Sequence, residues 1–233
     1  MIPSKTISIV IPIYNEEEIL KKVVEKLVYD LKKIIKNFEV LLVENGSTDK
    51  SFAIARELKK RYSEIRIKHL PKANYGLALK TGFRLAKSDL IINFSADWVD
   101  IFFLKKAIIY SKNYDVVLAS KLNIKSKDLR PITRRISGLL FHQLTRLILG
   151  LPFSDTHGIR LIKRRSVQKI INECLLGEEG FEAEMLFKSH KAGLKILELP
   201  VVIRESRPSR SKIAKIALRA LCQLFKIKYA KIL

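Results

Sequence analysis

A regular alternation of apolar runs and amphipathic segments most constrains what this chain can fold into. The apolar runs are rich in β-branched residues and have the length of buried strands. They lie at residues 6–13, 38–43, 65–70, 90–94 and 116–119. The segments between the first four runs carry the spacing or the capping residues of helices, which we expect at 16–35, 47–62 and 77–86. Alternation of this kind predicts an α/β fold with a doubly wound, mostly parallel sheet and flanking helices.

The second half of the chain has a different pattern, which begins with a polar and basic stretch at residues 121–135. The elements expected after it are an apolar helix at 136–149, a helix at 182–192 and a strand at 195–203. The tail from Ser211 mixes Ile and Leu with Lys and Arg at helical spacing. We expect one domain over residues 1–210, with a nucleotide-binding half (1–120) and an acceptor half (121–210). A basic amphipathic helix over 211–233 should follow it.

The charge balance narrows the classes of partner. The chain has 45 Lys and Arg against 23 Asp and Glu, a formal net charge of +22. Such a surplus attracts nucleic acid, an anionic membrane surface or phosphorylated substrates. Nucleic acid is disfavoured because the sequence has no platform of stacking aromatics and no recognition motif. No window offers the roughly 20 apolar residues that a membrane-spanning helix needs, so we expect a cytoplasmic protein that lies peripherally on the cytoplasmic face of the membrane.

Acidic residues follow several of the expected strands. Glu16 and Glu44 come after the first and second strands, and Asp97 comes just after the run that ends at Phe94. Ligand chemistry in open α/β sheets gathers at the carboxyl ends of the strands, so these carboxylates are expected in one crevice. Tyr14 could pack on a base there. The competing interpretation is ordinary turn chemistry, with Glu16 favoured by the dipole at a helix start.

An ordered set of motifs runs from about residue 6 to residue 212. Its members are Pro12-Ile13-Tyr14-Asn15-Glu16, Glu44-Asn45-Gly46-Ser47, Asn74-Tyr75-Gly76-Leu77-Ala78 with Gly82, Ser120-Lys121, Asp155-Thr156-His157-Gly158-Ile159-Arg160, Phe181-Glu182-Ala183-Glu184, and Glu198-Leu199-Pro200-Val201 with Arg207 and Ser211-Lys212. Each motif alone is loose, but the order of the set resembles the family 2 inverting glycosyltransferases of GT-A fold, nearest the dolichol-phosphate mannose synthase group. The resemblance therefore implies a GT-A-type sheet and transfer of a sugar from a GDP- or UDP-sugar to a polyprenyl or dolichyl phosphate.

The resemblance also assigns roles to individual residues. The donor would be bound by Pro12, Tyr14, Glu16, Glu44, Gly76, Ser95 and Asp97. The acceptor phosphate would be held by Arg134, Arg135, Arg160, Arg207 and Lys212. The catalytic group would comprise Asp97, Lys121, Arg135 and Arg207, with Lys121 facing the donor diphosphate. A membrane-anchoring subunit is a further candidate partner.

Of the departures from the family, which include Asn74 for a glycine, Glu44 for Asp and Lys121 for Arg, the one with most consequence lies at the metal element. Where two carboxylates of an Asp-x-Asp element would bind a divalent metal and the donor, this chain has Ser95 and Asp97, and Val99 stands where a third ligand is often found. Mg²⁺ and Mn²⁺ sites rely on charged oxygen ligands together with substrate phosphates. We therefore expect metal binding through Asp97 to be greatly weakened, with Asp100 as a partial replacement ligand.

Three functions remain open on these residues. A polyprenyl phosphate is already an anionic nucleophile, so its glycosylation needs positioning and charge stabilisation more than a strong base. A hydroxyl acceptor would need a general base, for which Glu184 and Asp155 are candidates. A catalytically degenerate relative that binds a nucleotide sugar, a lipid phosphate or a partner is the third, suggested by Ser95 and Val99.

Overall fold

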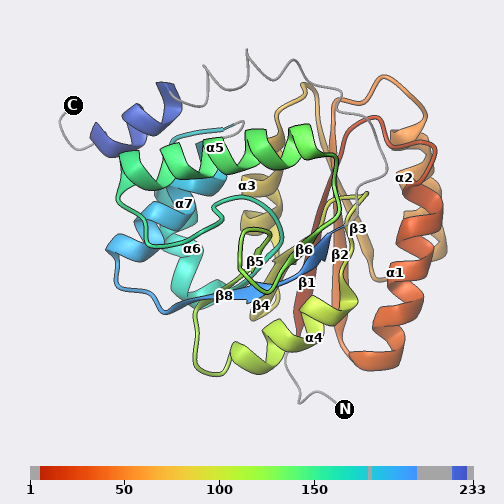
Figure 1. Cartoon of the computed structure of the whole chain (residues 1–233). Helices are drawn as coiled ribbons and strands as arrows, with labels where there is room; N and C mark the ends of the chain where they lie inside the picture. Colours follow the sequence, from red (N-terminus) through yellow and green to blue (C-terminus); the bar gives the residue numbers. More distant parts are fainter. Residues whose placement is uncertain (1–5, 178–179, 204–221, 230–233) are drawn as a thin grey trace.

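The computed structural model describes residues 6–177, 180–203 and 222–229, and Figure 1 shows their arrangement. The nine strands are β1 (Ile7–Ile13), β2 (Phe38–Asn45), β3 (Ile65–Leu70), β4 (Leu90–Asn93), β5 (Val116–Ser120), β6 (Lys127–Asp128), β7 (Arg160–Lys163), β8 (Ile196–Pro200) and β9 (Val202–Ile203), counted within these described ranges. The helices are α1 (Leu20–Ile34), α2 (Ser51–Arg61), α3 (Tyr75–Leu85), α4 (Ile101–Tyr110), α5 (Ile132–Leu149), α6 (Arg164–Glu173) and α7 (Gly180–Lys191). Residues 222–229 are also helical.

The central sheet has the strand order β3-β2-β1-β4-β7-β5-β8. The first four strands in this order are parallel, and β5 and β8 are parallel to each other. Strand β7 runs antiparallel to both of its neighbours, β4 and β5. The predicted doubly wound, mostly parallel sheet is therefore confirmed, and β4 ends at the centre of the sheet with its carboxyl end beside those of β1 and β2.

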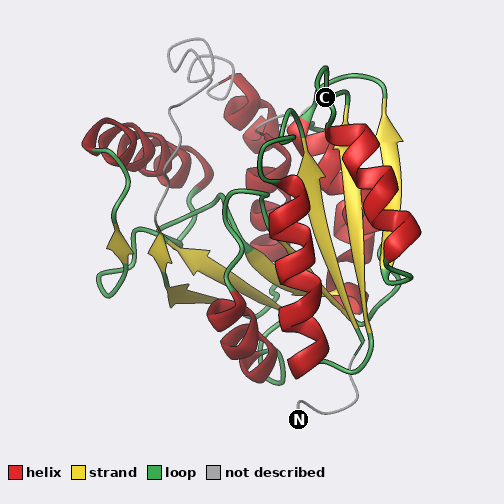
Figure 2. Ribbon diagram, turned by 90° about the vertical axis from the view of Figure 1, so that its right-hand side faces the viewer, coloured by secondary structure: helices red, strands yellow, loops and turns green. Residues whose placement is uncertain are grey.

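Helices cover both faces of this sheet, as Figure 2 shows. One buried cluster joins the sheet to α1, α2 and α4, and a second joins its other face to α3, α6 and α7. Strand β1 serves both clusters because successive side chains point to opposite faces, so that Ile9 and Ile11 enter the first cluster and Val10 enters the second. This explains why β1 reads as a continuous apolar run in the sequence.

Helix α3 approaches the sheet very closely at Gly82. A Cβ atom at this position would lie 2.2 Å from Cγ1 of Val10 and 3.2 Å from Cγ2 of Val43. Any side chain larger than hydrogen would therefore push α3 away from β1 and β2. Because the amino-terminal end of α3 stands beside the ends of these strands, the glycine helps to fix the geometry of the crevice.

Four elements were not expected from the sequence: α4, β6, β7 and α6. The expected elements agree with the structure to within a few residues, apart from the last strand, which is divided into β8 and β9. The basic stretch 121–135 contains β6 and the first turn of α5. Ser47 and Thr48 do not cap α2, whose N-cap position is Lys50, because both residues bond to the loop after β1 instead.

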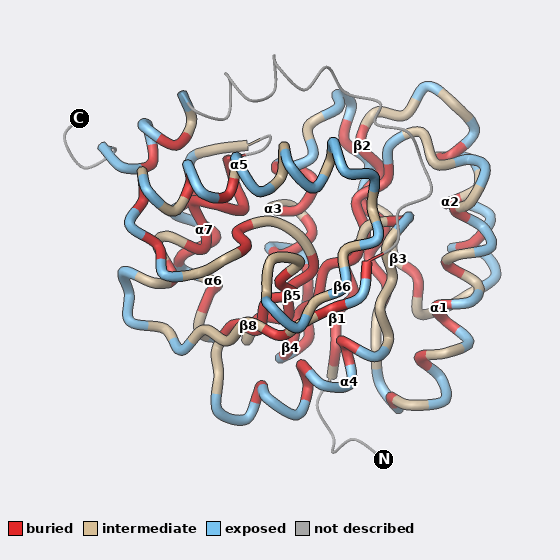
Figure 3. The backbone as a smooth tube through the Cα atoms, in the orientation of Figure 1, coloured by how far each residue is buried: buried red, intermediate tan, exposed pale blue. Residues whose placement is uncertain are grey.

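Helix α5 lies apart from the layers of the sheet, across the upper part of the molecule in Figure 1. Its preceding loop is tied down by β6, which pairs with β9 in a separate two-stranded sheet. Figure 3 shows exposed stretches along α5, broken by buried positions such as His142 and Thr145, whereas the strands below it are largely buried. Among the described residues, no helix is long and apolar enough to cross a membrane.

Candidate active site

The loops after β1 and β2 are bonded to each other. Asn15 adopts a left-handed backbone conformation (φ 53°), which asparagine tolerates better than most residues. Its backbone N–H donates to Ser47 Oγ at 3.1 Å, and its side-chain Oδ1 accepts the N–H of Thr48 at 2.8 Å. The N–H of Glu16 donates to Ser51 Oγ at 2.7 Å. The two motifs expected to bind the donor therefore form one rigid unit at the carboxyl edge of the sheet.

Glu44 belongs to this unit but is not exposed to the crevice. Only 1% of the residue is accessible, and its carboxylate accepts the N–H of Ser47 at 2.6 Å and bonds to His69 Nδ1. Burial alone would raise the pKa of Glu44, but the bonds from Ser47 and His69 outweigh it and lower the pKa below its usual value. This carboxylate thus holds its own loop, and the direct contact of Glu44 with the donor stays a prediction from the sequence.

A pocket of about 220 Å³ lies past the end of β4. Ser95, Asp97 and Lys121, three of the predicted site residues, line it. The other lining residues are Tyr75, Trp98, Arg130, His157, Gly158, Glu182 and Ile203. Asp97 is exposed, so its carboxylate is accessible to a ligand. We call this cavity the donor pocket, because it holds the acidic residue after β4 that the sequence singled out.

Lys121 is held rigidly at the wall of the donor pocket. Its side chain is 9% exposed, and Nζ lies 3.0 Å from Asp155 Oδ2 and 2.7 Å from the carbonyl oxygen of His157. An ammonium group has three donors, so one N–H remains for a ligand oxygen. The absence of a side chain at Gly158 makes room for this arrangement, since a Cβ there would lie 3.0 Å from Nζ. Gly158 also has φ +126°, which favours glycine.

Asp155 organises the residues behind Lys121. It accepts the backbone N–H of Lys121 at 3.1 Å, and its Oδ1 lies 3.2 Å from His142 Nε2. Burial would raise the pKa of Asp155, but Lys121 and His142 hold it well below its usual value. Burial lowers the pKa of His142 to about 3, so His142 is neutral near pH 7, and its Nδ1 lies 3.3 Å from Thr156 Oγ1. Glu198 completes the support by accepting the N–H of Asp155 at 3.1 Å.

Arg160 lies below the donor pocket and not on its surface. The residue is 1% exposed, and its guanidinium bonds to the Glu182 carboxylate and, at 3.1 Å, to the carbonyl oxygen of Thr156. The guanidinium of Arg160 is therefore used within the protein, and its predicted contact with an acceptor phosphate stays a prediction. Beside this pair, the ring of Tyr75 is partly exposed. Burial of its hydroxyl raises the pKa of Tyr75 well above 10.0, and the negative charges of Glu182 and Asp97 raise it further, whereas Arg160 lowers it.

The ligands for a divalent metal are incomplete. Asp100 caps α4 by accepting the N–H of Phe103 at 2.8 Å through Oδ1, so one of its two carboxylate oxygens is already bonded. Ser95 forms a backbone bridge to Trp98, and Val99 has no ligand atom. In the described ranges no group of three His, Cys, Asp or Glu side chains could hold a metal ion. The described residues do not form a two-carboxylate metal centre at the donor pocket, because, of its two lining carboxylates, Asp97 is exposed whereas Glu182 is buried and paired with Arg160.

A second pocket adjoins the donor pocket through Lys121, which lines both. It has a volume of about 390 Å³ and lies against the first turns of α5. Its polar lining residues are Lys121, Ser126, Asp128 and Arg135, and its apolar ones are Leu122, Ile132, Ile136 and Leu139. We call it the α5 pocket. Because the carboxylate of Asp128 is paired with Arg130, the two cations and four aliphatic side chains suit a ligand with an anionic head and a hydrocarbon tail.

The apolar lining of the α5 pocket continues onto an exposed surface. Leu140 is 61% exposed and Leu147 is 80% exposed, at positions that share a face of α5 with Ile136 and Leu144. The predicted acceptor residue Arg135 is exposed on the same helix, and Arg134 is half-buried there. Arg207 and Lys212 lie outside the described residues.

Four predicted donor residues remain. Pro12 and Gly76 are buried, whereas Tyr14 is exposed and Glu16 is half-buried in the bonded loops. Glu184, a candidate base, is also buried. It accepts the N–H groups of Leu175 and Leu176 at 3.0 and 2.8 Å and pairs with Lys188 at 2.9 Å.

Sequence reasoning missed Tyr75, Arg130 and Glu182 as pocket residues, although Tyr75 and Glu182 lie within the quoted motifs.

The fold and the site together define a class. The sheet is mostly parallel with one antiparallel strand, an acidic residue follows β4, and Lys121 and Arg130 line the same pocket. This combination is typical of the nucleotide-sugar transferases of GT-A fold. Residues 8–171 match the family described as glycosyl transferase family 2, and this chain belongs to that family. The resemblance seen in the motifs is thereby confirmed, and the protein is a glycosyltransferase.

The match to this chain covers different fractions of the similar proteins. An uncharacterised protein of Methanocaldococcus jannaschii is 28% identical over 204 residues, which cover 84% of this chain and 80% of that protein. An undecaprenyl-phosphate 4-deoxy-4-formamido-L-arabinose transferase of Pectobacterium atrosepticum is 31% identical over 174 residues, 73% of this chain and 52% of the transferase. The glycosyltransferase AglD of Haloferax volcanii is 26% identical over 84% of this chain and 32% of its own length. The chain therefore spans about half and a third of the latter two relatives.

Solved structures share the fold. Glucosyl-3-phosphoglycerate synthase from Mycobacterium tuberculosis, in complex with Mn²⁺, UDP and glucosyl-3-phosphoglycerate, superposes with a TM-score of 0.70. The match covers 96% of this chain and 80% of that one at 18% sequence identity. At this identity the likeness establishes the fold, which can thus accommodate a divalent metal with a nucleotide.

Proposed function

We propose that this glycosyltransferase moves a sugar from a GDP- or UDP-sugar to the phosphate of a polyprenyl-phosphate lipid at a membrane surface. The observation that carries the proposal is the α5 pocket. Its aliphatic side chains and its two cations, Lys121 and Arg135, match the two parts of such an acceptor, and Lys121 also lines the donor pocket. A lipid phosphate bound there would meet the donor at this lysine.

The proposed reaction needs little proton transfer. A phosphate oxygen of the acceptor forms a bond to the anomeric carbon, and the bond from that carbon to the donor diphosphate breaks, which releases the nucleoside diphosphate. The configuration at the carbon inverts. Lys121 would stabilise charge on the departing diphosphate with its remaining N–H, and Asp97 would bind the donor from the opposite wall of the pocket.

The state of the two candidate bases favours a phosphate over a hydroxyl acceptor. Asp155 is paired with Lys121, and its lowered pKa makes it a weak base. Glu184 is bonded to the loop at Leu175 and Leu176. A hydroxyl nucleophile would need one of these groups to be accessible and basic, whereas a phosphate is already anionic.

Arg160 and Glu44 take different roles in this proposal from those expected from the sequence. Both are buried and bonded within the protein, so we propose that they position the pocket walls while Arg134 and Arg135 approach the acceptor phosphate. For Mg²⁺ or Mn²⁺, one carboxylate offers too few charged ligands. We expect such ions to bind weakly, through Asp97 and the donor phosphates.

Two further observations support an acceptor in a membrane. The exposed apolar face of α5 carries basic residues beside it, which is the pattern of a helix that lies in an anionic interface. A relative of 31% identity is named for transfer involving undecaprenyl phosphate. Attachment to the cytoplasmic face and the involvement of an anchoring subunit remain predictions from the sequence.

The proposal is tested with purified protein, a membrane lipid extract and a panel of radiolabelled GDP- and UDP-sugars, each with and without Mg²⁺ or Mn²⁺. We expect one donor to transfer label into an acid-labile lipid. If the protein binds nucleotide but none of the donors gives labelled product, the proposal is wrong and the chain is a binding relative. If label enters only acid-stable glycosides, the acceptor is a hydroxyl.

A further inference from the structure

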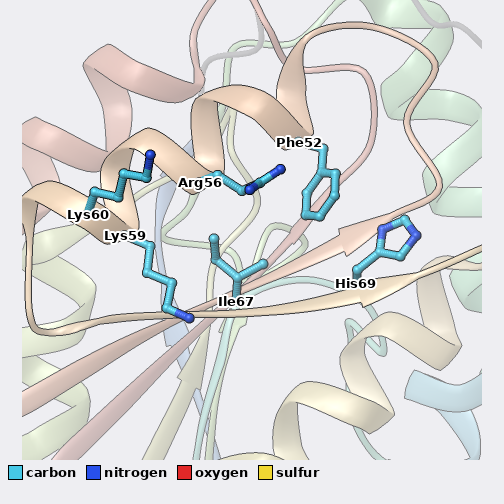
Figure 4. Close-up of a pocket in the computed structure, with 6 residues that line it drawn as sticks. All are labelled: Phe52, Arg56, Lys59, Lys60, Ile67 and His69. Atoms are coloured by element: carbon cyan, nitrogen blue, oxygen red, sulfur yellow. The ribbon is translucent and has the colours of Figure 1, made fainter.

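A groove lies outside the donor and α5 pockets, between α2 and the edge strand β3, and Figure 4 shows its lining. Its volume is about 470 Å³, within the range of small-molecule sites. The groove is lined by Phe52, Arg56, Lys59, Lys60, Ile67 and His69. None of these residues lines the donor pocket or the α5 pocket.

The cations of this groove differ from those of the active site. In the donor pocket Lys121 is paired with Asp155, and Arg130 is paired with Asp128. Arg56, Lys59 and Lys60 have no ion-pair partner within the ranges that the structure describes. No carboxylate lines the groove. Three positive charges along a concave surface whose lining has no carboxylate create a field that attracts an anion.

The remaining walls are apolar and ordered. Phe52 and His69 stack with ring centroids 4.8 Å apart, and Ile67 forms the floor between them and the lysines. Figure 4 shows Arg56 and Lys59 extending from α2 over the part of β3 that carries Ile67, whereas Lys60 is turned away from the strand. His69 is fixed from behind by its bond to Glu44. The groove thus offers two separated cations above a flat, preformed surface.

We propose that this α2–β3 groove is a second ligand site, which binds a small molecule carrying a diphosphate or two phosphate groups. The separated guanidinium and ammonium groups of Arg56 and Lys59 would each take one phosphate, since both form charge-assisted hydrogen bonds to phosphate oxygens. The inference is independent of the acceptor proposed above, because it concerns neither Lys121 nor α5.

Calorimetry with inorganic pyrophosphate at constant ionic strength tests the proposal. Trp98, the single tryptophan of the chain, lines the donor pocket, so its fluorescence reports separately on pyrophosphate bound there. The variant Arg56→Gln/Lys59→Gln removes the two cations of the groove. Lys21→Gln/Lys22→Gln, which removes two exposed lysines of the α1 region, is the matched control for loss of charge.

We expect the wild-type protein and the control to bind pyrophosphate at two sites, only one of which changes the fluorescence of Trp98. In the groove variant, the affinity for pyrophosphate should fall at least about tenfold at the site that does not change the fluorescence, as loss of charged hydrogen bonds predicts. Its affinity at the other site should stay the same. A single site that coincides with the fluorescence change in all three proteins would overturn the proposal. So would equal weakening in the groove variant and the control.

Discussion

At the scale of single residues, the site depends on which charged groups are exposed and which are used internally. Ser95, Asp97 and Lys121 could be placed from the sequence because each follows a strand that the pattern identifies. The burial of Glu44 and Arg160 could not, since it depends on partners 25 and 22 positions away, His69 and Glu182. The position of a residue in a motif predicts which part of the fold it lies in. Its hydrogen-bond and ion-pair partners determine whether its side chain is accessible to a ligand.

Lys121 is the residue shared by the two pockets, and Lys121→Met should therefore impair the reaction more than it impairs folding. We expect kcat/KM for sugar transfer to fall roughly 100- to 1000-fold, as loss of one preorganised donor at a developing charge predicts. The control is Lys127→Met, which removes an exposed lysine on β6. Steady-state assays that gave equal losses for the two variants would contradict the role assigned to Lys121.

Ser95→Asp tests the altered metal element. A second carboxylate beside Asp97 should raise the affinity for Mn²⁺ at least about tenfold in the presence of nucleoside diphosphate, because these ions bind through charged oxygens. Ser95→Asn is the control, with similar size and no charge. The number and affinity of Mn²⁺ ions bound are measured by electron paramagnetic resonance. Identical affinities in both variants would show that loss of the carboxylate is not what weakens the site.

At the scale of elements, the parallel half of the sheet could be predicted because each strand and helix carries its own periodicity. Strand β7 could not, since it has four residues and its antiparallel direction is set by pairing with β4 and β5. Helix α4 was missed because it is apolar on most sides, and only Lys105 and Lys106 mark a polar face. Elements defined by tertiary pairing leave little signal in the local sequence.

Helix α5 should control attachment to membranes. Leu140→Gln/Leu147→Gln removes the two most exposed leucines of its apolar face. We expect binding to anionic phospholipid vesicles to weaken roughly tenfold or more, since each leucine that enters an apolar environment contributes about 1.5–3 kcal/mol when fully buried. Leu175→Gln, at a leucine that is 77% exposed away from α5, is the control. Equal vesicle sedimentation of both variants would exclude α5 as the membrane-binding element.

At the scale of the whole molecule, one folded unit joins the parallel strands β1 to β4 to a later half that supplies Lys121 and α5. The two halves share the antiparallel strand β7 and the buried cluster that contains α3, α6 and α7. The predicted boundary at residue 210 lies outside the described residues, so the division of the domain from its tail stays a prediction. The overall class could be predicted because many weak motifs occur in a fixed order.

The buried network around Asp155 links the stability of the whole fold to pH. The folded state keeps His142 neutral down to pH 3, whereas in the unfolded chain it takes up a proton near pH 6.5. The unfolded state therefore binds more protons between these values, and stability falls by up to about 1.4 kcal/mol per pH unit as the pH drops below 6.5. The lowered pKa of Asp155 adds a further loss below pH 3.8.

Urea unfolding at pH 7.0 and 5.0 checks this linkage. The wild-type protein should lose roughly 2 kcal/mol between the two pH values from His142. His142→Gln keeps a hydrogen-bond donor for Asp155 but removes the titrating group, so this difference should become smaller in the variant. A pH dependence that is the same in both proteins would mean that His142 is not buried in its neutral form.

The central claim is that the acceptor is a lipid phosphate held at Lys121 and Arg135. The most direct measurement compares undecaprenyl phosphate with undecaprenol, which has the same chain and a hydroxyl in place of the phosphate, as acceptors for the nucleotide sugar that the donor panel identifies. The account predicts sugar transfer to the phosphate, with no measurable transfer to the alcohol. Equal or faster transfer to undecaprenol would contradict it.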